Sequence, residues 1–133
     1  GLAFDRSDGD LPVYSARDRR VSIVCGDYYA LRDEKFDAHF DRGALIAIPP
    51  SARQRYAEHT KTLLSSNACQ LVITVEYDQQ RAAGPPFSVV PEALTSLWPG
   101  LECVERREDI ANAPPKFLQA GLESMHEVVW WKD

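Results

Sequence analysis

The sequence lacks any long apolar run, and no stretch approaches the roughly 18 consecutive apolar residues that a membrane-spanning helix requires. Cysteine is scarce and odd in number: Cys25, Cys69 and Cys103 are far apart and form no Cys-x-x-Cys pair. This spacing argues against a disulfide framework and predicts buried thiols in a cytoplasmic protein. The three histidines show no metal-ligand spacing, so we expect no metal site.

Basic charge is also in short supply, because the net charge is −5, which argues against a nucleic-acid-binding surface. The sequence contains no nucleophile elbow, no phosphate-binding glycine loop and no zinc-protease motif. Its first ten residues carry no signal-peptide pattern. With 133 residues, of which 44% are hydrophobic and 26% charged, the chain predicts one globular domain covering residues 1–133.

The central stretch, residues 38–50, reads AHFDRGALIAIPP and places Asp41, Arg42 and Gly43 among apolar neighbours. Charges in such surroundings cost free energy unless they are paired or hydrogen-bonded. One interpretation is a strand end followed by a turn, with both charges solvated. The other is a ligand pocket at the carboxyl end of a strand, where open α/β sheets bind their ligands.

The pattern around this stretch predicts a strand–helix–strand unit. We expect a strand ending at Asp41, a helix over residues 51–64 that begins after two prolines, and a nearly continuous apolar strand over residues 69–77. Residues 65–67 favour a turn between helix and strand. Before this unit, residues 21–25 predict a strand that ends in a Gly-Asp turn.

The remainder of the chain predicts a helix over residues 91–98 and two strands, over 101–106 and 123–131, that can form a hairpin. Residues 79–89 form a Gly- and Pro-rich loop in which Phe87 either walls a flat ligand or packs on the core. The connection between the last two strands is long, and long ordered loops usually have a function.

Five blocks in register (CGDYYAL, FDRGALIAIPP, EYDQ, GPPFSV and PKFLQAG) resemble the thiopurine S-methyltransferase family from residue 21 to the end. The resemblance implies an α/β fold, the Rossmann-like fold of class I methyltransferases. The sheet of this fold is mostly parallel, with helices on both faces and the strand order 3-2-1-4-5-7-6. It also implies S-adenosylmethionine as cofactor. The chain resembles the carboxyl-terminal portion, so the amino-terminal strands 1 and 2 are missing from it, and residues 21–25 would be strand 3.

The resemblance also implies roles for particular residues. Arg42 resembles a cofactor-site or active-site residue; Asp41 either orients it or forms a structural ion pair. The cofactor-binding turn is expected at Gly26, Asp27 and Tyr28. We expect the wall over the acceptor to include Pro85, Pro86, Phe87 and Lys116.

The function implied is methyl transfer by in-line displacement to small aromatic or heterocyclic thiols, which needs mainly positioning and exclusion of water. Selenium, tellurium or halide acceptors would leave the same residues in place. A non-catalytic remnant or interaction module is the alternative. Without strands 1 and 2, strand 4 would keep an unpaired apolar edge, so we also expect self-association through that edge.

Overall fold

The computed structural model describes residues 3–133 and divides the chain into two compact units, Gly1–Glu34 and Lys35–Asp133. The prediction of one domain covering residues 1–133 does not anticipate this division. Each unit has its own sheet.

The amino-terminal unit is a three-stranded antiparallel sheet in the order β1-β2-β3. Its strands are β1 (Phe4–Ser7), β2 (Val13–Ala16) and β3 (Ser22–Val24), and a short 3-10 helix, η1 (Tyr28–Ala30), follows them. The strand expected over residues 21–25 is present, but it pairs with β2 in an antiparallel sheet and not as strand 3 of a parallel one. No residue from 3 to 34 is buried, so this unit has no hydrophobic core of its own.

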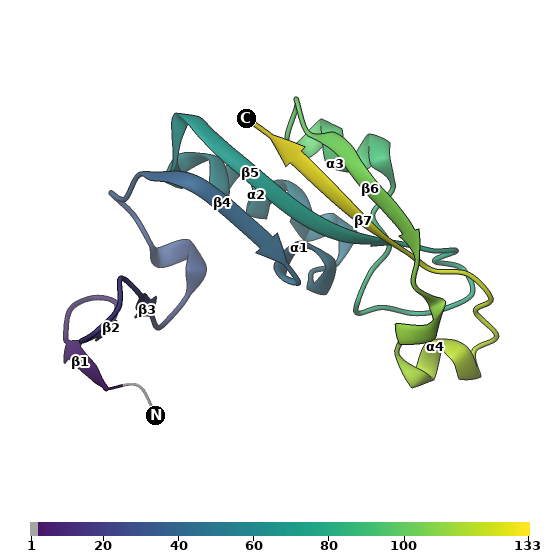
Figure 1. Cartoon of the computed structure of the whole chain (residues 1–133), viewed down its shortest axis with the longest axis horizontal. Helices are drawn as coiled ribbons and strands as arrows, with labels where there is room; N and C mark the ends of the chain where they lie inside the picture. The colour runs from purple at the N-terminus through teal and green to yellow at the C-terminus, as the bar shows by residue number, and fades with distance from the viewer. Residues whose placement is uncertain (1–2) are drawn as a thin grey trace. The chain divides into compact units, whose positions relative to one another are not determined.

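The carboxyl-terminal unit is built on a four-stranded sheet in the order β4-β5-β7-β6 (Figure 1). Its strands are β4 (Phe36–Arg42), β5 (Leu64–Glu76), β6 (Glu102–Glu108) and β7 (His126–Lys132). The order is the one expected for the second half of the family's sheet. The sheet is mixed: β4 and β5 are parallel, whereas β7 is antiparallel to both β5 and β6. Because β6 is also antiparallel to β7, it runs in the same direction as β4 and β5, so three of these four strands share one direction, as expected for a mostly parallel sheet.

The predicted strand–helix–strand unit is confirmed, because β4 and β5 are parallel neighbours joined through helices. These helices are α1 (Ala44–Ala47), the 3-10 helix η2 (Pro50–Ala52) and α2 (Arg53–Leu63). Pro50 lies in the first turn of η2, where its missing N–H costs no hydrogen bond. The predicted helix after residue 90 is α3 (Pro91–Leu97), and the predicted hairpin strands are β6 and β7.

Helices α1, α2 and α3 lie on one face of this sheet (Figure 1). Side chains alternate along β5, so Gln70, Val72 and Thr74 are buried toward those helices while the intervening residues are only partly buried. Leucine, tyrosine and tryptophan side chains from the helices and from β7 complete this core. The indole N–H of Trp130 donates to the Thr74 hydroxyl at 2.9 Å, which satisfies two buried polar groups.

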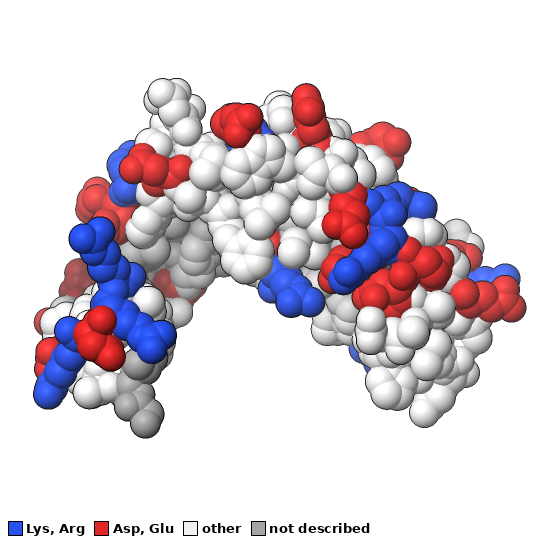
Figure 2. All heavy atoms as spheres, viewed as in Figure 1, with Lys and Arg blue, Asp and Glu red and all other residues white. Residues whose placement is uncertain are grey.

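The opposite face of the sheet is called the open face here. It carries Phe36 and Phe40 of β4, which are 43% and 64% exposed. Figure 2 shows a largely uncharged surface over β4 and β5, with charged side chains grouped over β6. Within residues 35–133, no helix covers this face, so the expectation of helices on both faces is not met in this unit.

The turn expected over residues 65–67 is wrong, because β5 follows α2 directly. The pairing with β4 changes register there, from Phe36 opposite Leu64 to Ala38 opposite Cys69. The turn-favouring residues occupy this irregularity, and the Ser65 hydroxyl donates to Asp37 at 2.9 Å. Their preference for turns is thus expressed as a break in the strand register.

The cysteines also differ from expectation. All three are free, but Cys25 and Cys103 are exposed and Cys69 is only partly buried. Cys25 follows a strand of the coreless unit, and Cys103 lies on the fully exposed β6. Apolar neighbours in sequence do not ensure burial where the element itself has no packing partner.

Candidate functional site

The candidate site lies at the edge of the four-stranded sheet where β4, β5 and β6 end and β7 begins. Three connections leave this edge: residues 43–63, residues 77–101 and residues 109–125. Ligands of α/β sheets bind at such carboxyl edges, because loops there can place several side chains around one space. The sequence placed Asp41, Arg42 and the proline loop at this edge, and the structure confirms those positions.

Asp41 is 3% exposed and lies under the start of α1. Its carboxylate accepts hydrogen bonds from the backbone N–H groups of Ala44 and Leu45, at 3.0 and 3.2 Å, and from the Tyr56 hydroxyl, at 3.0 Å. The carboxylate thereby caps N–H groups that a helix start leaves without partners. It ties β4, α1 and α2 together.

Arg42 projects from the opposite face of β4, because consecutive strand residues alternate. Its Nη2 lies 3.7 Å from Oε2 of Glu127 on β7. The other oxygen of that carboxylate, Oε1, accepts a 2.6 Å hydrogen bond from Nη2 of Arg107 on β6. Glu127 is therefore shared by two arginines on the open face.

The expectation that Asp41 orients Arg42 is wrong. The two side chains lie on opposite faces, and each has its own partners: helix N–H groups and Tyr56 for the first, Glu127 for the second. The interpretation in which both charges are solvated fails for Asp41 as well, whereas Arg42 is 65% exposed. Any effect of Asp41 on catalysis would therefore be indirect, through its hydrogen bonds that hold β4, α1 and α2 together.

The proline loop, residues 84–88, is fixed by hydrogen bonds from three sides. Tyr77 Oη donates to the Pro86 carbonyl at 2.6 Å, and the Phe87 N–H donates to the Ile46 carbonyl at 2.6 Å. From α2, Nη2 of Arg53 donates to the Phe87 and Ser88 carbonyls, at 3.4 and 3.1 Å. The loop is thus held against α1 and α2.

Within this loop, Pro85 is exposed, whereas Pro86 and Phe87 are partly buried. The ring of Phe87 packs against Gly84, where an added Cβ would approach a ring atom to 2.4 Å, so only glycine fits. Phe87 therefore packs locally while keeping part of its ring accessible, which leaves both sequence interpretations of this aromatic open.

Arg53 supports the loop from a buried position, with 5% exposure. Burial lowers the pKa of its guanidinium, opposed by the nearby Tyr77. Its Nε has no hydrogen-bond partner within residues 3–133, which makes Arg53 a buried cation held only by carbonyl groups. Burial also raises the pKa of Tyr77, so its hydroxyl stays protonated and remains a donor to the loop.

The connection between β6 and β7 is ordered by two short helices, η3 (Ile110–Asn112) and α4 (Pro115–Gln119). Lys116, on α4, is exposed, and its Nζ lies 5.3 Å from the centre of the Phe117 ring. Phe117 is buried in a second core cluster together with Ala82 of the preceding loop. The two long loops therefore lie together at one edge of the sheet.

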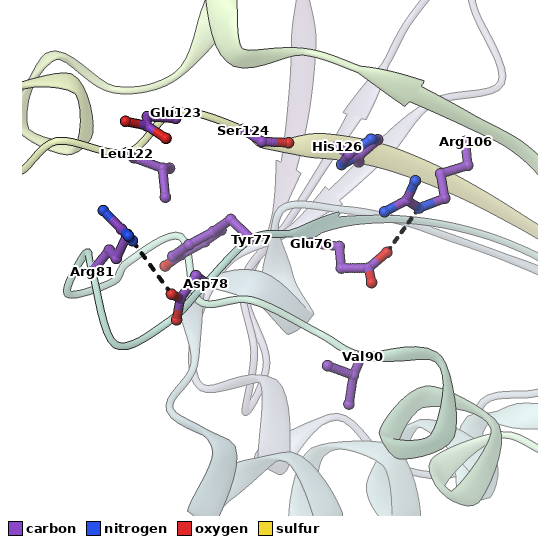
Figure 3. A pocket seen from close by; sticks show the side chains of 10 residues that line it. All are labelled: Glu76, Tyr77, Asp78, Arg81, Val90, Arg106, Leu122, Glu123, Ser124 and His126. Carbon is purple, nitrogen blue, oxygen red and sulfur yellow. Dashed lines mark hydrogen bonds and ion pairs between the residues drawn. The ribbon is translucent and has the colours of Figure 1, made fainter.

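A cavity of about 370 Å³ opens beside these loops, on the helix-bearing side of the sheet (Figure 3). Two ion pairs line it, Glu76 with Arg106 at 3.0 Å and Asp78 with Arg81 at 3.5 Å. Its other lining residues are Tyr77, Val90, Leu122, Glu123, Ser124 and His126. None of the site residues expected from the sequence lines this cavity.

The expected cofactor turn lies in the amino-terminal unit. Gly26, Asp27 and Tyr28 line a hollow of about 150 Å³ together with apolar side chains of Leu11, Val24 and Leu31. Gly26 has a φ of 149°, and an added Cβ would approach Leu11 Cδ2 to 2.5 Å, so the turn requires glycine. Oδ1 of Asp27 accepts from the Tyr29 N–H at 2.9 Å and starts η1.

Glu127, Arg107 and Arg53 were not predicted from the sequence. Glu127 and Arg107 belong to strands whose pairing partners are distant in sequence, and only the register brings them beside Arg42. Arg53 stands at the start of the predicted helix, on the face that becomes buried. Its burial could have been predicted from helical spacing, because Arg53 stands one turn before Tyr56 and Ala57, on the same face of the helix.

Within residues 3–133, no cluster of three or more His, Cys, Asp or Glu side chains is arranged to hold a metal ion. Over the same residues, no helix has the length and apolar character needed to span a membrane.

Comparison with known proteins points in one direction. A family model described as thiopurine S-methyltransferase matches residues 10–133. A protein named thiopurine S-methyltransferase from Pseudomonas putida is 42% identical over 130 residues, covering 94% of this chain and 59% of the relative. Proteins of the same name from Pseudomonas syringae pv. tomato and Pseudomonas fluorescens are 38% and 40% identical, each covering 92% of this chain and 57% of the relative. The chain thus spans 57–59% of the length of these relatives.

Proposed function

The chain belongs to the thiopurine S-methyltransferase family, and on that premise we propose that it forms the carboxyl-terminal portion of an S-adenosylmethionine-dependent S-methyltransferase. The acceptor is a small aromatic or heterocyclic thiol. The observation that carries the proposal is Arg42, a cation at the carboxyl end of β4, in one of the blocks that resemble the family. The relatives' remaining length would supply strands 1 and 2 and complete a Rossmann-like sheet.

The amino-terminal unit contains a hollow that suits one part of the cofactor. Its hollow combines apolar walls with a carboxylate at Asp27 and an aromatic ring at Tyr28. Such a hollow suits a flat heterocycle with an amino group, because the ring packs on apolar surface while the amino group donates to the carboxylate. We propose that Gly26, Asp27 and Tyr28 hold the adenine of S-adenosylmethionine.

When bound, S-adenosylmethionine supplies a methyl group activated on a sulfonium. A thiol acceptor would take this methyl group as its thiolate, after its proton has been lost to solvent. The chain's own residues orient the two reactants and exclude water from the site. Arg42 stabilises the anionic acceptor or a cofactor carboxylate by a charge-assisted hydrogen bond. Pro85, Pro86 and Phe87 border the acceptor on the loop that Arg53 and Tyr77 hold, and Lys116 borders it from α4.

Selenium, tellurium or halide acceptors would need the same positioning. We propose a cytoplasmic location, which the three free cysteines support because a reducing compartment preserves thiols.

The test joins this chain to the part of the Pseudomonas putida relative that lies outside the match, and compares the fusion with the chain alone. We expect the fusion to bind S-adenosylmethionine by calorimetry and to transfer a labelled methyl group to a thiopurine. The chain alone should transfer none. A well-folded fusion that binds neither cofactor nor thiol would contradict the proposal and favour a non-catalytic module.

A further inference from the structure

Glu127 is the centre of a charged cluster on the open face, formed with Arg42 and Arg107. Its carboxylate is 14% exposed, whereas the two arginine side chains are 65% and 57% exposed. One carboxylate oxygen faces each guanidinium, at 3.7 Å for Arg42 and 2.6 Å for Arg107. The cluster carries one negative and two positive charges, so a net positive charge remains at this place.

The strand register explains why these three residues meet. Val75, Glu127 and Arg107 stand side by side on β5, β7 and β6, whereas Arg42 stands beside Ile73 of β5. The side chain of Arg42 therefore reaches across β5 to the carboxylate. Its length allows many rotamers, and an ion pair restricts them.

Glu127 is itself held in place. It lies on an inner strand that is paired on both sides, and Arg107 binds its second oxygen in a short charge-assisted hydrogen bond. An exposed arginine with no such partner would sample many directions, whereas Arg42 has an anchored partner on a neighbouring strand.

We propose that Glu127 is a positioning residue: it holds the guanidinium of Arg42 at the carboxyl edge, and Arg107 fixes Glu127 from the other side. The inference rests on the proposed function for its effect on methyl transfer, but not for its effect on Arg42. The arrangement leaves the remaining N–H groups of Arg42 available to an anionic ligand.

The first experiment measures the motion of Arg42 directly. NMR relaxation of the Arg42 Nε–Hε group is compared between the wild-type protein and the Glu127→Gln variant, which keeps the side chain's shape but removes its charge. We expect a restricted guanidinium in the wild type and a mobile one in the variant. The matched control is Glu58→Gln, which alters an exposed carboxylate of α2 bonded to Gln54. It should leave the Arg42 signal unchanged.

The second experiment is a double-mutant cycle on kcat/KM in the active fusion. Glu127→Gln alone should lower kcat/KM by about fivefold, the upper end for a partly exposed ion pair. In a protein that already carries Arg42→Gln, Glu127→Gln should lower kcat/KM by less than about twofold, because the arginine through which Glu127 acts is absent.

The outcomes separate the two proposals. Equal Arg42 mobility in the wild type and in Glu127→Gln would overturn the positioning role, as would fully additive effects in the cycle, even in an active enzyme. A protein without methyl transfer in which Glu127→Gln frees Arg42 would keep the positioning role and overturn the proposed function.

Discussion

Asp41 and Arg42 are consecutive residues of β4, yet their side chains lie on opposite faces of the sheet and have no partner in common. Asp41 is buried against α1 and α2, whereas Arg42 meets Glu127 on the open face. The alternation of strand side chains imposes this separation. One residue of the pair therefore serves the fold, and the other is available to a ligand.

Replacement of Asp41 by asparagine should destabilise the protein. The amide would retain one acceptor but place an NH2 group where backbone N–H groups and the Tyr56 hydroxyl now donate. We expect a loss of about 1.5–3 kcal/mol in the free energy of unfolding, the range for hydrogen bonds to charged groups. Urea denaturation measures it. Asp37→Asn on the same strand is the control, because Asp37 is exposed, and it should change stability by less than about 0.5 kcal/mol.

Replacement of Arg42 by glutamine should lower activity and leave stability nearly unchanged. Its side chain is 65% exposed, so the free energy of unfolding should change by about 0.5 kcal/mol or less. Loss of a charge-assisted contact of about 1.5–3 kcal/mol corresponds to a fall of about 10- to 150-fold in kcat/KM of the active fusion. Lys61→Gln, on the exposed side of α2, should leave kcat/KM unchanged. Unchanged kcat/KM for Arg42→Gln with a large loss of stability would identify a structural ion pair.

Arg53 should control the shape of the proline loop. Replacement by methionine removes the donors to the Phe87 and Ser88 carbonyls and also removes a buried cation. We expect faster amide hydrogen exchange over residues 84–90, together with a higher KM for the acceptor. The matched control is Arg55→Met on the exposed side of the same helix. If exchange in the loop stayed at the wild-type rate, the hydrogen bond that Tyr77 donates to Pro86 and the one that Gln79 accepts from the Ser88 N–H would be sufficient to hold it.

Histidine 39 provides a test by pH. Burial lowers the pKa of its imidazole, and the neighbouring Asp41 opposes the shift. The folded protein therefore favours the neutral ring, and this contribution to stability is complete above about pH 6.5, the ordinary value, and is lost as pH falls through the folded pKa. An NMR titration should show His39 protonating below that value. A midpoint above the ordinary value would show that Asp41 outweighs burial.

The open face should promote self-association of the chain when it is studied alone. Phe40 is 64% exposed on β4, an edge strand of the four-stranded sheet. A lysine at position 40 would place a charge on this edge, a common means of preventing strand pairing between molecules. We expect sedimentation to show less association for Phe40→Lys than for the wild type. Because the side chain is exposed, the thermal midpoint should change little.

The elements of the larger unit were largely predictable. The apolar run of β5 and the double proline before α2 are local signals, and both indicated the observed structure. The strand over residues 21–25 was predicted, but its place in a small antiparallel sheet was missed, because the strands of that sheet are short and exposed and carry little pattern. The three residues 65–67 misled for a related reason: their turn preference was satisfied by a change of register inside a strand.

The site was predictable only in part. Arg42 and the proline loop were found through their sequence blocks. These blocks give positions along the chain but do not show on which face of the sheet a side chain lies or which residues it contacts. Glu127 became visible only once β7 was placed between β5 and β6. The cavity beside Glu76 and Arg106 depends on the same pairing, since its two walls are far apart in sequence.

The position of β7 also bears on the order in which the protein can fold during synthesis. β6 leaves the ribosome before β7, but its neighbour in the sheet is β7 and not β5. β6 must therefore wait, unpaired, until residues 126–132 have emerged. Its exposed charges, among them Glu102, Arg106 and Glu108, keep the waiting strand soluble. Translational pauses before residue 126 should prolong this interval and make nascent chains more sensitive to proteases.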